Sequence, residues 1–147
     1  MSFFDSLNAS VSGLNAQRVR MDVITQNLTN IDTTRTANGG PYKRKTVIFK
    51  EIEPSSNFSS FLNKAIGEQN FAGGVKVSQI VEDNSEGPIE YDPNHPDADE
   101  NGYVKKPNVN VVEEMVNMIS SNRAYEANIT AINTTKSMIT KTLEIGR

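Results

Sequence analysis

Proline and glycine are concentrated in the middle of this 147-residue chain, and this distribution limits where long helices can form. All six prolines and seven of the nine glycines lie between Gly39 and Pro107. Because these two residues interrupt helices, residues 1–33 and 108–147 are predicted to form two long helices in one discontinuous domain. Residues 34–107 are predicted to form a β-rich insert, so the expected fold class is α+β.

The C-terminal flank carries apolar residues at alternating steps of four and three, the spacing of a coiled-coil seam. Two polar members, Asn122 and Lys136, occupy the same heptad position, where a polar side chain selects register or partner. The pattern predicts a coiled-coil-like helix pair, and an amphipathic helix packed on its own core is the alternative. This C-terminal stripe comprises Val111, Met115, Met118, Asn122, Tyr125, Ile129, Ile132, Lys136, Ile139 and Leu143.

The N-terminal flank has a different repeat, with large apolar residues spaced by seven at Leu7, Leu14, Met21 and Leu28. Other apolar residues precede the first two of these by three positions and follow the last two by three. The apolar surface therefore crosses the helix, which favours contact with two different neighbours. A broad ordinary core face explains the pattern equally well.

The insert contains segments that alternate apolar and polar residues, as half-buried strands do. Strands are predicted at residues 45–52 and 75–83, with shorter pieces at 88–91 and 102–104. Residues 53–74 are expected to form a flexible link, with a short helix at 58–66.

Composition excludes several classes of protein. Cysteine is absent, so no disulfide or thiolate metal site can form. The net charge of −3 argues against nucleic-acid binding, and no apolar run approaches the ~18 residues of a membrane span. Hydrophobic residues make up only 36% of the chain, so both terminal helices are expected to be largely disordered in the free subunit and to fold on assembly.

Three groups of residues could serve in catalysis, metal binding or ion pairing, and each also has a simpler structural explanation. Asp97 and Asp99 open a sequence like a calcium loop, but Asn108 stands where the bidentate Glu belongs, so a solvated acidic loop is expected. His95 is the only histidine, and no Gly-x-Ser-x-Gly elbow accompanies it, so it is expected to shape a turn rather than serve a hydrolase. The basic run 43–45 is compatible either with ion pairs to a neighbouring subunit or with a solvated strand edge. No enzyme activity, metal or cofactor is therefore predicted.

Residues 12–34 resemble the N-terminal signature of bacterial flagellar axial proteins, the family of rod and hook subunits. Residues 34–44 and 91–147 are similar to the proximal-rod members of this family. Thr29 and Asn94 depart from the family pattern, at positions where Ala and Gly are expected. The residues that carry the N-terminal signature are Gly13, Leu14, Ala16, Arg20, Asn27, Asn30 and Thr33.

The resemblance implies a structural subunit of the proximal rod in the flagellar basal body, which polymerises helically, transmits motor torque and lines the export channel. A distal-rod or hook subunit is the alternative, and a calcium-binding module or hydrolase ranks below it. The implied partners are further copies of the chain, other rod proteins, the flagellar type III export apparatus, and MS-ring or adaptor proteins at the rod base. The implied location is periplasmic, reached without a cleavable signal peptide.

The sequence also predicts which residues form the assembly interface. Asn27, Asn30 and Thr33 are expected to close the end of the first helix, and Arg20 and Arg123 to form charge-assisted bonds between helices. The predicted interface set is Leu7, Leu14, Arg20, Met21, Asn27, Leu28, Asn30, Thr33, Met115, Met118, Asn122, Arg123, Tyr125, Ile129, Ile132, Ile139 and Leu143.

Overall fold

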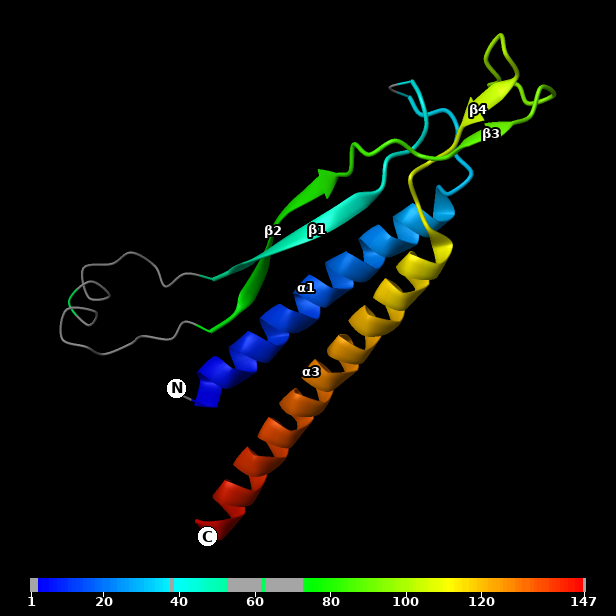
Figure 1. Cartoon of the computed structure of the whole chain (residues 1–147). Coiled ribbons are helices and arrows are strands. Elements are labelled where there is room, and N and C mark those ends of the chain that lie inside the picture. Colours follow the sequence, from blue (N-terminus) through cyan, green and yellow to red (C-terminus); the bar gives the residue numbers. More distant parts are fainter. Residues whose placement is uncertain (1–2, 38, 53–61, 63–72, 147) are drawn as a thin grey trace.

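The computed structural model describes residues 3–37, 39–52, 62 and 73–146. Two long helices dominate it: α1 spans Phe3–Thr29 and α3 spans Val111–Ile145. They lie side by side and run antiparallel, with the insert between them in sequence (Figure 1). The predicted α+β class is confirmed, whereas the flexible link 53–74 and its short helix lie almost entirely outside the described residues.

The two helices differ in length, so part of α3 extends beyond the end of α1. α1 has 27 residues and α3 has 35, which correspond to about 40 and 52 Å at 1.5 Å per residue. Figure 1 shows the C-terminal end of α3 continuing beyond the N-terminal end of α1. The last turns of α3 therefore project past the helix pair.

The insert forms two antiparallel ribbons. Strands β1 (Lys45–Glu51) and β2 (Val75–Glu82) pair along α1, with a register shift between Ile48 and Phe49. Strands β3 (Ile89–Tyr91) and β4 (Tyr103–Lys105) form a shorter ribbon near the end of α1 and the start of α3 (Figure 1). All four strands lie within one or two residues of the predicted segments.

Little apolar surface is buried inside the chain. The buried hydrophobic residues among those described are Ala16, Val23, Ile24, Tyr42 and Val104. A two-stranded ribbon is at best marginally stable alone, so β1 and β2 depend on their contact with α1. Because this apolar core is small, polar contacts contribute much of what holds these elements together.

Candidate functional site

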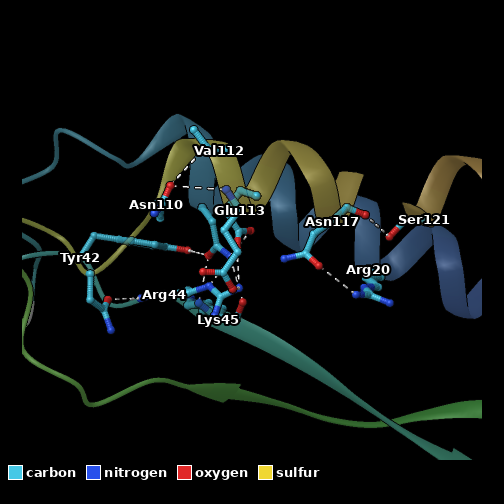
Figure 2. A network of polar contacts seen from close by, with 12 residues as sticks. Arg20, Tyr42, Arg44, Lys45, Asn110, Val112, Glu113, Asn117 and Ser121 are labelled. Carbon is cyan, nitrogen blue, oxygen red and sulfur yellow. Dashed lines mark hydrogen bonds and ion pairs between the residues drawn. The ribbon is translucent and has the colours of Figure 1, made fainter. Parts of the chain in front are cut away.

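A buried polar cluster joins the last turns of α1, the start of β1 and the first turn of α3 (Figure 2). Its centre is Asn27, which is 1% exposed. The Asn27 amide nitrogen donates to the Lys45 carbonyl oxygen at 2.9 Å and to Glu114 Oε2 at 3.0 Å. Its oxygen accepts from the Lys45 N–H and from the Tyr42 hydroxyl, both at 2.9 Å. We call this group the Asn27 cluster: Asn27, Tyr42, Arg44, Lys45, Glu113 and Glu114.

Arg44 compensates the charge of Glu114, a carboxylate that is itself 1% exposed. Arg44 Nε donates to Glu114 Oε1 at 2.8 Å, and Nη2 lies 2.9 Å from Glu113 Oε1. Burial alone would lower the pKa of Arg44, but the hydrogen bond that Arg44 donates to Glu114 and the nearby acidic charges outweigh burial and raise that pKa. Because an unpaired carboxylate at this depth would be costly, Glu114 requires Arg44 for this arrangement.

Tyr42 brings an aromatic ring and one hydroxyl into the same cluster. Burial, followed by the negative charges of Glu82 and Glu114, raises the pKa of the Tyr42 phenol above its ordinary value of 10.0. The hydroxyl therefore stays protonated at neutral pH and donates to Asn27.

Two further asparagines fix the entry into α3. Asn110 caps the helix, since its side-chain oxygen accepts from the N–H groups of Val112 and Glu113 (Figure 2). Asn108 accepts from the Arg44 N–H at 2.8 Å and donates to the Asp83 carbonyl at 3.1 Å. These bonds place the first turn of α3 against the ends of both long strands.

The two helices meet through small and polar side chains and through only part of the C-terminal stripe, which lies on α3 and is called the α3 stripe from here on. Arg20 Nη2 donates to Asn117 Oδ1 at 3.3 Å, and Asn27 bonds Glu114. At Gly13, an added Cβ would lie 3.0 Å from the Asn128 amide nitrogen, so the helices come close there. The contact face of α3 is therefore displaced by about one residue from the stripe.

The α3 stripe lies partly buried and partly exposed in the single chain. Its half-buried members are Met118, Tyr125, Ile132 and Ile139. Met115 is 53% exposed and Leu143 71% exposed. The remaining exposed members are Val111, Asn122, Ile129 and Lys136.

The other predicted interface residues fall into three environments. The heptad row of α1, Leu7, Leu14, Met21 and Leu28, is half-buried. Arg123 is exposed, with no hydrogen bond or ion pair to any residue within the described ranges. At the end of α1, Asn30 Nδ2 donates to the Gln26 carbonyl at 2.9 Å, and the Thr33 hydroxyl bonds Asn30 Oδ1. Asn27 instead bonds the backbone of β1, a role that the sequence analysis did not anticipate.

The acidic loop between β3 and β4 is held by contacts within the chain. Asp97 Oδ2 accepts from the Thr34 hydroxyl at 2.8 Å, and Asp97 Oδ1 lies 3.6 Å from Arg35 Nη1. His95 Nδ1 accepts from the Asp97 N–H at 3.1 Å, so the imidazole takes part in the turn. Within residues 3–37, 39–52, 62 and 73–146, no group of three His, Asp or Glu side chains is arranged to hold a metal ion.

The basic run also finds its contacts inside the chain. Arg44 pairs with α3, Lys45 Nζ lies 3.9 Å from Glu82, and Lys43 donates to the Asn84 side chain at 2.7 Å. Neither of the two interpretations of this run anticipated its contribution to a buried cluster. No helix in the described part of the chain is both apolar and long enough to cross a bilayer.

Comparison with known proteins identifies the family. The protein-family model described as "Flagella basal body rod protein" matches residues 7–35 of the sequence. A second family model, "Flagellar basal body rod FlgEFG protein C-terminal", matches residues 100–145. The flagellar basal-body rod protein FlgC of Bacillus subtilis is 53% identical over 100% of both chains. This chain belongs to the FlgC family of flagellar basal-body rod proteins. FlgC of Borreliella burgdorferi is 46% identical over 99% of this chain and 98% of its own, and FlgC of Salmonella typhimurium is 40% identical over 100% of both.

The two family models cover the parts of this FlgC-family chain that form the helix pair. One match contains most of α1, and the other contains β4 and α3. Asn27 and Glu114, which join the two helices, lie in different matched regions. The resemblance to flagellar axial proteins is confirmed, and with it the assignment of the chain as a structural rod protein of the flagellar basal body.

Proposed function

We propose that this chain polymerises helically in the proximal rod, where its helix pair lines the export channel and transmits motor torque. The observation that carries the proposal is the position of the α3 stripe. Contacts between α1 and α3 use polar and small residues, while Met115, Ile129 and Leu143 keep exposed apolar surface over most of the length of α3. Burying that surface against neighbouring subunits supplies the main driving force for assembly.

We further propose that the helical domain, residues 1–33 and 108–147, completes its folding during assembly. The few buried apolar side chains support this, because they offset little of the entropy lost when two long helices are ordered. In a dilute monomer, amides across residues 1–30 and 110–145 are expected to exchange rapidly. Slow, strongly protected exchange there would contradict this second proposal and leave the first intact.

The proposed partners follow from this mode of assembly. They are further copies of the chain, other rod proteins, MS-ring or adaptor proteins at the rod base, and the flagellar type III export apparatus. Delivery of an unfolded chain into the periplasm requires no cleavable signal peptide in this scheme. The role proposed is mechanical, with no catalytic step, and it is supported by the use of His95 and Asp97 in turn contacts.

The decisive experiment places a charge on the α3 stripe. Ile129→Asp is expected to abolish rod assembly and motility without blocking export, because a desolvated carboxylate in an apolar interface is strongly unfavourable. Asn133→Asp, at an exposed position one turn away on the same helix, is the matched control and is expected to remain motile. A motile Ile129→Asp strain with normal rods would overturn the proposal.

A further inference from the structure

One edge of strand β1 carries backbone groups that lack partners in the described part of the chain. Lys45 uses both of its backbone groups on the Asn27 side chain, so these groups point away from β2. Backbone groups in an antiparallel pair alternate between the two edges, and Val47 therefore directs its N–H and its carbonyl to the same side as Lys45. No described residue hydrogen-bonds the Val47 backbone on that side. The Asn27 amide thus occupies the first position of an edge that is unpaired at its next position.

The unpaired edge lines a groove between β1 and the start of α3. The groove has a volume of about 320 Å³, and α1 forms its third side. Figure 2 shows β1 diverging from α3 beyond the Asn27 cluster. Its apolar lining comes from Val23 and Ile24 on α1 and from Val47 and Phe49 on β1. A groove of this kind fits an extended segment, which adds to the strand edge through main-chain hydrogen bonds and places alternate side chains against the apolar lining.

One cation in this groove lacks an acidic partner within the described ranges. Arg20 donates to the neutral Asn117 side chain at 3.3 Å and makes no ion pair there. The other charged residues of the groove already form ion pairs; they are Arg44, Lys45, Glu113 and Glu114. An incoming carboxylate would therefore find its partner in Arg20, whose remaining guanidinium donors suit a charge-assisted hydrogen bond.

We propose that the β1 edge binds an extended segment of a different rod protein by strand addition, with an acidic side chain of that segment paired to Arg20. A two-stranded ribbon is marginal by itself, so a third strand also stabilises β1 and β2. The described strands of a second copy are each paired within a ribbon, and a ribbon is wider than the single strand that the groove accepts. The inference rests on the proposed function, since it requires neighbouring rod subunits, and it names the kind of segment that one of them contributes.

Proline substitution tests the strand edge. Val47→Pro removes the outward N–H and leaves the hydrogen bonds between β1 and β2 in place, as proline does at the open side of an edge strand. Ile80→Pro is the matched control, because Ile80 is the register partner of Val47 and its N–H points to the opposite edge of the ribbon. Val47→Pro is expected to lower the yield of rod-containing basal bodies on the order of tenfold, and Ile80→Pro by less than about twofold.

Val47→Ala separates the loss of the N–H from the loss of the side chain. It keeps the N–H and is expected to retain about half or more of the native yield. Equal yields for Val47→Pro and Ile80→Pro, or for Val47→Pro and Val47→Ala, would overturn the inference.

Substitutions of Arg20 test the ion pair without altering the backbone. Arg20→Gln can still donate to Asn117 but carries no charge, whereas Arg20→Lys keeps the charge. The yield of rod-containing basal bodies is expected to fall on the order of fivefold with Gln and to stay at about half or more with Lys. If Gln serves as well as Lys, Arg20 acts only through its bond to Asn117 and the proposed ion pair is wrong.

Photo-cross-linking identifies the bound segment. A benzophenone amino acid placed at Thr46, which lines the groove, is activated in isolated basal bodies. The expected product joins this chain to a different rod protein, at a segment that contains Asp or Glu. Rods that contain the labelled chain but give no product, or a product of twice the 16.2 kDa chain mass, would contradict the proposal. Incorporation of the unsubstituted chain into basal bodies reports on the proposed function independently.

Discussion

Asn27 Nδ2 lies 3.0 Å from Glu114 Oε2, and this bond ties the end of α1 to the start of α3 across 87 positions of sequence. The same Asn27 amide pairs with both backbone groups of Lys45, much as a neighbouring strand would. One side chain therefore fixes two helices and a strand relative to one another.

Replacement of Asn27 by Ala is expected to destabilise the folded subunit by about 2–4 kcal/mol, because it leaves the Tyr42 hydroxyl and the Lys45 backbone groups buried without partners. The measurement is the temperature at which isolated rods release the subunit. Asn15→Ala, at an exposed position of α1, is the control and is expected to change this temperature little. Equal release temperatures for the two variants would show that the cluster does not stabilise the fold.

The stability of the assembled subunit is expected to fall as the pH rises above about 10. The pKa of Tyr42 is raised in the folded state, so the unfolded chain loses the phenol proton first. The stabilisation is complete below the unfolded pKa and is lost as the pH rises through the folded pKa.

The comparison for this pH effect is Tyr42→Phe, which keeps the ring and removes the titrating hydroxyl. The variant is expected to be less stable at neutral pH, because Asn27 loses a donor, and to show a flatter decline as the pH rises above about 10. Release of the subunit from isolated rods, followed against pH for both chains, is the measurement. Parallel pH curves would exclude Tyr42 as the source of the effect.

Local sequence patterns predicted the elements of this fold but not how the elements are joined. The strand expected at 45–52 forms as β1 at Lys45–Glu51, because alternation and turn residues act within a few positions of one another. The Asn27 cluster depends on groups 15 to 87 residues apart in sequence, which no local pattern contains. The available signals were a polar Asn27 at helical spacing from the apolar Val23 and Ile24, and an acidic pair, Glu113 and Glu114, at the start of the second helix together with a basic run at 43–45.

The heptad pattern of α3 illustrates a second limit. Periodicity identifies which side chains share a helix face, but it does not identify what covers that face. In the single chain α1 covers the adjacent line containing Asn117 and Asn128, so Met115 and Ile129 remain exposed. Small residues such as Gly13 decide this orientation, since they allow a close approach that the larger apolar residues do not.

The contact between Gly13 and Asn128 predicts a coupled pair of substitutions. Gly13→Ala favours the helical state by about 0.5–1 kcal/mol through backbone entropy, but its Cβ would press on the Asn128 amide. The gain is therefore expected to be larger in an Asn128→Ala background than in the native chain. Subunit release temperatures for the four chains of the double-mutant cycle measure this coupling. Equal gains in the two backgrounds would mean that the helices are not in limiting contact there.

Gly102, in the loop between β3 and β4, provides a prediction for the stability of the β3–β4 ribbon. Its φ of +81° lies in the left-handed region, and an added Cβ would lie 2.9 Å from Tyr91 Cε2. Gly102→Ala is expected to destabilise the β3–β4 ribbon by about 1–2 kcal/mol, from the backbone conformation alone. The Asp92 N–H, which donates to the Gly102 carbonyl at 3.0 Å, is then expected to exchange with solvent roughly tenfold faster.

Gly73→Ala is the control for this exchange measurement, since its Cβ meets only the Ala9 Cβ at 3.8 Å. Unchanged exchange at Asp92 would show that the ribbon tolerates the strain, and that the packing of Tyr91 against Tyr103 does not depend on a glycine at this turn.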